Sequence, residues 1–167
     1  IPGSLVGSEM CIRDRLDLDS NEISLSDFDE NLFISYIFSK CPMPNLCPAI
    51  FMKNRILANQ FANHDNIRFL LVSFDYVYDI PSTLKNNYGH SVKNNSNIEI
   101  LSSTNHIEDV YRLVKQSGGD FWGVDNNKIG HKLSSVLVGP NKEILGIWKG
   151  EKWIASQVAN SISMLLK

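Results

Sequence analysis

Two continuous apolar runs of strand length constrain the fold of this chain more than any other feature. The first is LFISYIF at positions 32–38, and the second is IRFLLVS at positions 67–73. Such runs are typical of strands that are buried on both faces. Between them, apolar residues recur at helical spacing over positions 48–63, after a proline that a first helical turn tolerates. The sequence therefore predicts a strand–helix–strand unit with a right-handed crossover.

The rest of the chain continues the alternation of strands and helices. Asp79 is expected to cap a helix that starts at Ile80 and Pro81 and runs to Tyr88, with Gly89 as its stop. The other expected elements are a short strand or hairpin arm at 23–25, a strand at 98–101, a helix from 104 or 105 to 118–119, hairpin strands at 134–139 and 143–148, and a closing helix at 153–166. This order predicts an α/β fold, a thioredoxin-like sandwich in which helices flank a central mixed β-sheet.

The first fifteen residues are expected not to belong to the native protein. SLVGSEMCIRDR at positions 4–15 resembles a sequencing adapter translated in frame, and segments of that kind are excluded from fold reasoning. We therefore expect residues 1–15 to be an adapter-derived segment, in which Cys11 has no function. Residues 16–167 are expected to form a single domain that is truncated at its N-terminus.

Charge and hydropathy exclude two classes of partner. The net charge is −2 at pH 7 and the two signs are scattered, so the chain has no basic stripe for nucleic acid and no basic amphipathic helix for a membrane surface. No run approaches the roughly 18 apolar residues of a membrane-spanning helix. We therefore expect no nucleic-acid partner, and membrane contact only through a segment that preceded the present N-terminus.

A loop after the first strand contains two cysteines, in KCPMPNLCPAIF at positions 40–51. Cys41 ends the strand and Cys47 begins the helix, where unpaired backbone N–H groups and the positive end of the helix dipole favour a thiolate. Thiolates bind soft metal ions and attack disulfides. A metal clamp, a redox pair and a structural loop of small buried side chains all remain open from these residues alone.

Three motifs, taken in order, resemble the Sco/SenC family of copper-handling proteins. They are LFISYIFSKCPMPNLCP at 32–48, SFDYVYDIP at 73–81 and GHKLSSVLVGPNKEILGIWKG at 130–150. The resemblance implies that Cys41, Cys47 and His131 bind Cu(I) or Cu(II), which thiolate and imidazole donors suit. It also implies that Asp75 and Asp79 lie near the cysteine loop and orient the ligands through hydrogen bonds.

The resemblance implies a function as well as a site. The family includes copper metallochaperones that serve the assembly of the binuclear copper centre of cytochrome c oxidase. The expected partner is the oxidase subunit that carries this centre, or another copper-accepting protein. The expected location is extracytoplasmic, in the bacterial periplasm, with an inner-membrane anchor that is absent from this sequence.

An enzymatic alternative uses the same loop. Cys41 and Cys47 would then be the dithiol of a thiol-disulfide oxidoreductase, and we expect them to be able to form an intramolecular disulfide. His131 separates the two hypotheses, because a redox pair does not need it and a three-ligand copper site does. Peroxiredoxin is disfavoured because the chain lacks a P-x-x-x-T-x-x-C arrangement, and thioredoxin proper because no proline precedes the strand at 134–139.

The chain departs from the family pattern at several positions. Its cysteines follow C-x-x-x-x-x-C, whereas C-x-x-x-C is the commonest family spacing. Met43, a soft thioether between the cysteines, is expected to pack or to lie exposed, with a role as a weak extra ligand as the alternative. Tyr76 and Ile80 stand where the family usually has proline and threonine. Three histidines match no part of the pattern and are expected to be solvated helix or loop residues: His64, His90 and His106.

Overall fold

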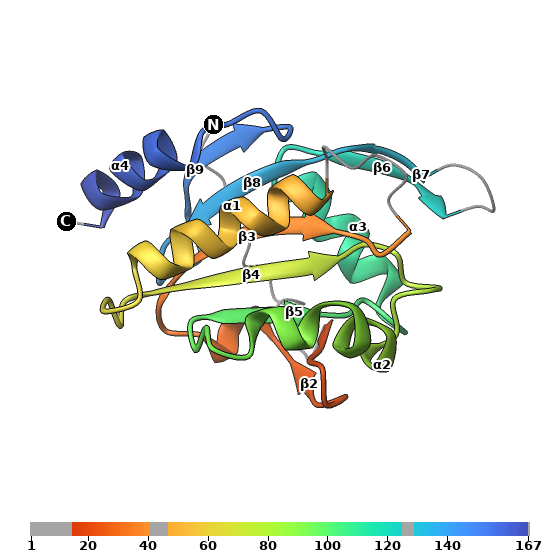
Figure 1. Cartoon of the computed structure of the whole chain (residues 1–167). Helices are drawn as coiled ribbons and strands as arrows, with labels where there is room; N and C mark the ends of the chain where they lie inside the picture. The colour runs from red at the N-terminus through yellow and green to blue at the C-terminus, as the bar shows by residue number, and fades with distance from the viewer. Residues whose placement is uncertain (1–14, 41–46, 125–128, 167) are drawn as a thin grey trace.

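The computed structural model describes residues 15–40, 47–124 and 129–166, and of these it describes 120–124 and 129–132 by their backbone only. The elements, in chain order (Figure 1), are β1 (Arg15–Leu16), β2 (Glu22–Ile23), the 3₁₀ turn η2 (Leu25–Asp27), β3 (Asn31–Ile37), α1 (Cys47–Gln60), β4 (Ile67–Ser73), α2 (Pro81–Leu84), the π-helical turn η3 (Lys85–Gly89), the 3₁₀ turn η4 (His90–Val92), β5 (Ile98–Leu101), α3 (Ile107–Gln116), β6 (Asp120–Val124), β7 (Ile129–Lys132), β8 (Ser134–Val138), β9 (Ile144–Lys149) and α4 (Ala155–Leu165).

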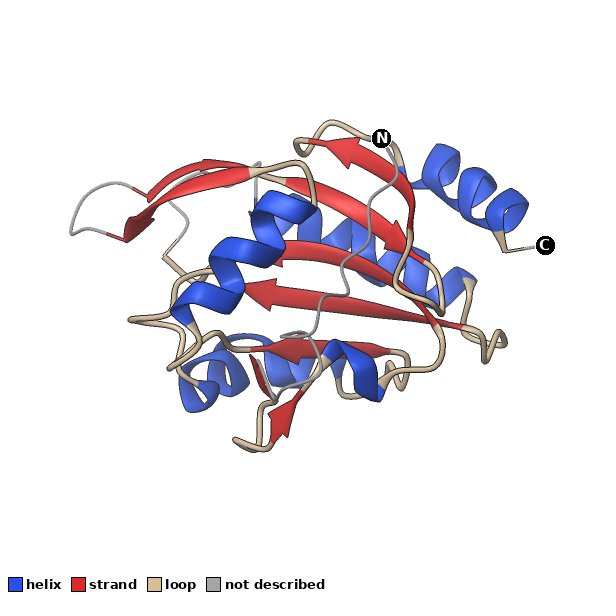
Figure 2. Ribbon diagram, turned by 180° about the vertical axis from the view of Figure 1, so that it is seen from behind, coloured by secondary structure: helices blue, strands red, loops and turns tan. Residues whose placement is uncertain are grey.

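A five-stranded mixed sheet forms the centre of the fold, with strand order β5-β4-β3-β8-β9. β3, β4 and β5 run parallel, whereas β8 is antiparallel to β3 and β9 is antiparallel to β8. α1 lies in front of the sheet in Figure 1, and α3 lies in front of it in Figure 2, which is seen from behind. The helices therefore cover both faces, which confirms the predicted thioredoxin-like sandwich.

Strand β3 shows why both faces are covered. All seven of its residues are buried. Leu32, Ile34 and Tyr36 belong to a cluster with apolar residues of α3, which we call the α3-side core. Phe33 and Ile37 belong to a second cluster with residues of α1 and α4, which we call the α1-side core. Because successive side chains of a strand point to opposite faces, a continuous apolar run supplies both cores at once.

The structure differs from the sequence predictions at two places. The first is an antiparallel arm of β6 and β7, separate from the main sheet, which the sequence did not predict. Its sequence DFWGVDNNKIGHK interrupts the apolar residues with glycine and asparagine and has no regular alternation. The helix predicted to end at Gly89 is also wrong, because α2 ends at Leu84 and helical turns continue through Val92. Gly89 has a φ of −56°, an ordinary helical value, so it does not stop the turn.

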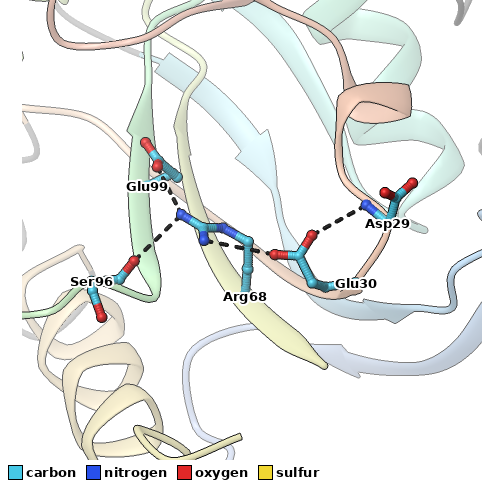
Figure 3. Close-up of polar contacts among 5 residues, drawn as sticks. All are labelled: Asp29, Glu30, Arg68, Ser96 and Glu99. Carbon is cyan, nitrogen blue, oxygen red and sulfur yellow. Dashed lines mark hydrogen bonds and ion pairs between the residues drawn. The ribbon is translucent and has the colours of Figure 1, made fainter. Parts of the chain in front are cut away.

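A group of charged side chains joins the amino ends of three strands (Figure 3). Arg68 of β4 forms ion pairs with Glu99 of β5 at 2.8 Å and with Glu30, just before β3, at 3.6 Å. It also donates to the Ser96 carbonyl, and Glu30 accepts the backbone N–H of Asp29. These side chains are partly exposed, so each pair contributes about 1 kcal/mol or less. They lie at the opposite end of the strands from the cysteine loop.

Candidate metal centre

Helix α1 begins at Cys47, and its first turn places this side chain inside the protein. Cys47 is 2% exposed and belongs to the α3-side core together with Phe38 and Phe74. Pro48 follows in the first turn, where its missing N–H costs no intrahelical hydrogen bond. The positive end of the helix dipole favours negative charge on the sulfur, while the apolar surroundings oppose it. A bound cation would supply the counter-charge.

The two ends of the cysteine loop are held at the same end of the sheet. Cys41 and Met43 lie outside the described residues, so their predicted roles stay predictions. Ser39, just before them, follows the carboxyl end of β3, and Cys47, just after them, starts α1. The loop therefore connects a strand end to a helix start, as the sequence predicted.

Contacts to the segment after β4 hold the first residues of this loop. The backbone N–H of Ser39 donates to Asp79 Oδ2 at 2.9 Å, and the Ser39 hydroxyl accepts from Asn87 Nδ2 at 2.9 Å. The ammonium of Lys40 lies 4.3 Å from the centre of the Tyr78 ring, a cation–π distance. Ser39 and Lys40, at the start of the cysteine loop, are therefore neighbours of the segment that contains Asp79.

The topology also brings the backbone of His131 to this end of the molecule. His131 lies on β7 and pairs with Phe121 of β6. β8 begins at Ser134 and runs antiparallel to β3, with Val136 opposite Ile34. The start of β8 thus lies beside the carboxyl end of β3, and Figure 1 shows the β6–β7 arm at the end toward which β3 and β4 point. The structure describes no side-chain position for His131, so its assignment as a ligand stays a prediction.

Side chains from three separate segments share the α3-side core at this end. Cys47 is a buried member of that core, and the partly buried Tyr76 and Leu133 pack against it. Tyr76 lies between the two aspartates, and Leu133 lies two residues after His131. One core therefore connects the cysteine loop, the aspartate segment and the segment that contains the histidine.

Asp75 lies two residues after the end of β4 and organises a tight turn. Its side chain is fully buried, and Oδ1 accepts the backbone N–H groups of Val77 at 3.2 Å and of Tyr78 at 2.9 Å. Within the described part of the chain, Oδ2 is buried without a hydrogen-bond partner. One oxygen thus orders the segment, and the other is an acceptor that a donor near the cysteine loop could use.

Asp79 does not cap α2, so that prediction is wrong. The residue at the N-cap is Ile80, which makes no side-chain cap bond. The Asp79 carboxylate is fully buried, and Oδ2 accepts the Ser73 hydroxyl at 2.6 Å in addition to the Ser39 N–H. Burial raises its pKa above the usual aspartate value, hydrogen bonds from Ser39 and Ser73 lower it, and the nearby Asp75 charge raises it further.

The raised pKa of Asp79 predicts a pH dependence of stability. Between the unfolded pKa, about 4, and the higher folded pKa, the native state binds more protons than the unfolded chain. The free energy of unfolding therefore falls as pH rises through this window. Asp79→Asn should remove this decline, which a series of thermal melts from about pH 4, the unfolded pKa, upward can measure. Asp65→Asn, at an exposed carboxylate, is the control, and a wild-type slope in Asp79→Asn would contradict the assignment.

Four serines complete this region, and sequence reasoning missed them. The Ser39 backbone N–H and the Ser73 hydroxyl donate to the Asp79 carboxylate, the Ser102 hydroxyl donates to the Asp79 carbonyl at 2.6 Å, and the Ser103 hydroxyl donates to the Ser73 carbonyl at 2.7 Å. The available signal was a serine at or just after the end of each of the three parallel strands. Three parallel strands bring such positions to one edge of a sheet.

The other three histidines lie on helical turns or loops, and two of them contact neighbouring side chains. His106 Nδ1 lies 3.5 Å from a carboxylate oxygen of Asp109, His64 packs edge-on against the Phe61 ring, and His90 is exposed. Among the described residues, which include neither Cys41 nor the His131 side chain, no group of three His, Cys, Asp or Glu side chains is placed to hold a metal ion.

The fold is shared with solved structures. Neither a protein-family model nor a curated protein matches the chain. A SCO1/SenC family lipoprotein from Bacillus anthracis matches with a TM-score of 0.77 and 16% identity, over 92% of each chain. Yeast Sco1 with copper bound matches with a TM-score of 0.71 and 19% identity, over 90% of this chain and 83% of its own. BsSco, a Sco-family cytochrome c oxidase assembly protein with a disulfide switch, matches with a TM-score of 0.69 and 21% identity, over 90% of this chain and 89% of its own.

These similarities confirm the predicted fold class and identify Sco-family proteins as structural neighbours. The neighbours also include a peroxiredoxin, PrxQ of Xylella fastidiosa. Since copper-bound proteins and a thiol enzyme share the fold, the activity has to be argued from the site.

Proposed function

We propose that this chain is a copper metallochaperone that binds one copper ion through Cys41, Cys47 and His131 and transfers it to a copper-accepting protein. The observation that carries the proposal is topological. The carboxyl end of β3, the first turn of α1 and the start of β8 lie together, and these three points adjoin the segments that contain the two cysteines and the histidine. Residues that are 84 positions apart, Cys47 and His131, thereby belong to one end of the fold.

The chemistry of the donor set fits copper as the cargo. Cu(I) prefers thiolate sulfur, and imidazole suits copper in either oxidation state. Burial of Cys47 in an apolar core also keeps water away from a soft ligand. Asp75 and Asp79 offer hard carboxylate oxygens and are already engaged with backbone N–H groups, so their proposed role is to hold the neighbouring segments in place.

The partner and the location follow from the same proposal. We propose that the acceptor is the cytochrome c oxidase subunit that carries the binuclear copper centre, because BsSco is a cytochrome c oxidase assembly protein. We also propose an extracytoplasmic, periplasmic site of action with an inner-membrane anchor, as the lipoprotein nature of the Bacillus anthracis neighbour suggests. Within the described ranges, the structure contains no helix of the length and hydrophobicity needed to cross a bilayer.

A thiol-disulfide oxidoreductase is the second candidate. It is favoured by the position of Cys47 at a helix N-terminus, which is where reactive thiols of redox proteins are found. BsSco, with its disulfide switch, is a structural neighbour in which such a bond operates. This candidate needs Cys41 and Cys47 and does not need His131.

Copper stoichiometry tests the proposal and separates the two candidates. The purified reduced protein should bind one copper ion per chain in competition with a chelator. His131→Ala should bind about tenfold more weakly, a loss of roughly 1.4 kcal/mol, because two of the three proposed ligands remain. His90→Ala is the matched control, since His90 is exposed and is not one of the proposed ligands. Equal binding by His131→Ala and wild type would remove His131 from the site and favour the oxidoreductase.

A further inference from the structure

We infer that Asp79 is a positioning residue for the cysteine loop, acting through the backbone of Ser39. The hydrogen bond from the Ser39 N–H to Asp79 Oδ2 fixes the chain two residues before Cys41. This inference deepens the proposed function and rests on it for its copper measurement. It assigns Asp79 a contact with the loop backbone and no contact with a ligand.

The carboxylate of Asp79 is suited to hold this backbone firmly. The residue is fully buried, as is Ser73, whose hydroxyl donates to the same oxygen at 2.6 Å. Hydrogen bonds to a charged acceptor away from water are stronger than those between neutral groups. Ser39 is also bound from its other side by the Asn87 amide. The loop therefore starts from a residue that is held by two partners outside the loop.

Asp79 is in turn fixed by two other strand ends. Its carbonyl accepts the Ser102 hydroxyl at 2.6 Å, and its N–H donates to the Asp75 carbonyl at 3.2 Å. Ser102 follows β5 directly and forms an isolated bridge with Leu16. These two hydrogen bonds join Asp79 to the segments that directly follow β4 and β5 of the central sheet. Through its bond to the Ser39 N–H, Asp79 therefore fixes the start of the cysteine loop relative to that sheet.

The consequence for copper is one of pre-organisation. Helix α1 and the surrounding core fix Cys47, whereas Cys41 is two residues beyond the fixed Ser39. Without the Asp79 bond, the first residues of the loop gain conformations that metal binding must then restrict. Ordering extra residues weakens binding even when every ligand is present.

Two variants of Asp79 and one matched control test this inference. Asp79→Ala removes the acceptor, whereas Asp79→Asn keeps an oxygen that can accept from Ser39. Ser103→Ala removes a buried hydroxyl that donates to the Ser73 carbonyl at 2.7 Å and makes no bond to Ser39. The two measurements are hydrogen exchange of the Ser39 amide without copper, and Cu(I) affinity by competition with a chelator.

Asp79→Ala should speed exchange of the Ser39 amide about tenfold or more and weaken Cu(I) binding about tenfold, in line with the loss of a hydrogen bond to a charged group. Asp79→Asn should bring both quantities back to within about threefold of wild type, since an amide oxygen retains part of that hydrogen bond. Ser103→Ala should leave both unchanged. A general loss of stability would affect Ser103→Ala as well, so this pattern is specific to the loop.

Several outcomes would overturn the inference. One is wild-type protection of the Ser39 amide in Asp79→Ala, and another is Cu(I) binding by Asp79→Asn that is as weak as that of Asp79→Ala. If the wild type binds no Cu(I), the proposed function fails, and amide exchange alone decides whether Asp79 holds the loop. Should Asp79→Ala not fold, the Ser39 amide proton of the wild type is expected to shift in the NMR spectrum as Asp79 titrates, and a constant shift would refute the bond.

Discussion

Buffered Cu(I) should raise the melting temperature of the reduced wild type by roughly 5–10 °C at a hundredfold excess of free ion over Kd, and Cys41→Ser or Cys47→Ser should lose nearly all of this shift. The excess corresponds to about 2.7 kcal/mol of added stability if the ion binds only the folded chain. Unfolded thiols also bind copper, so the observed shift belongs at the lower end of that range. Anaerobic melting with reductant is the measurement.

His131→Ala should behave differently from the cysteine variants in the same experiment. Two thiolates remain, so Cu(I) should still bind, but about tenfold more weakly than in the wild type, and stabilisation by a ligand falls as its Kd rises. The link between the β3–α1 loop and the segment before β8 is lost, however, so a large share of the thermal shift should disappear. His90→Ala and Cys11→Ser are the controls and should melt like the wild type. A copper-dependent shift in His131→Ala as large as in the wild type would exclude the histidine from the site.

Phe74→Ala should destabilise the protein by about 3–5 kcal/mol, because a fully buried aromatic ring leaves a cavity. Phe74 directly follows β4 and is 0% exposed, and its ring lies 4.9 Å from that of Phe38. Both rings belong to the α3-side core together with Cys47. We therefore expect weaker Cu(I) binding as well, since the packing that fixes Cys47 is loosened. Denaturant unfolding and chelator competition measure the two effects.

Phe69→Ala is the matched control for this prediction. Phe69 is also 0% exposed, but it lies in the α1-side core with its ring 5.8 Å from that of Phe33. A similar loss of stability is expected from the similar cavity, with Cu(I) affinity close to that of the wild type. If both variants lose copper affinity equally, the effect comes from global stability, and the local role of Phe74 is wrong.

The strands and the main helices could be predicted from the sequence because their signals are local. The strands at 67–73 and 98–101 have the predicted bounds, and α1 starts within one residue of its predicted first position. A strand buried on both faces needs an apolar residue at nearly every position, and a helix needs a repeat of 3.6 residues. Both requirements are met within a single segment. The candidate ligands Cys41, Cys47 and His131 were also named from the sequence, because three motifs in the family's order contain them.

Only the tertiary structure decided which residues hold the cysteine loop in place. Asp79 was predicted to cap α2, but its carboxylate binds Ser39, which lies 40 residues earlier in the chain. Likewise, Ser102 reaches Asp79 from a distance of 23 residues. His131 lies on the β6–β7 arm, and the sequence of that arm has no alternating apolar pattern from which its two strands could be predicted. A buried polar group forms its hydrogen bond with whichever partner the fold brings within about 3 Å. Which partner that is depends on how the ends of distant strands meet. The local periodicity of the sequence does not encode this arrangement.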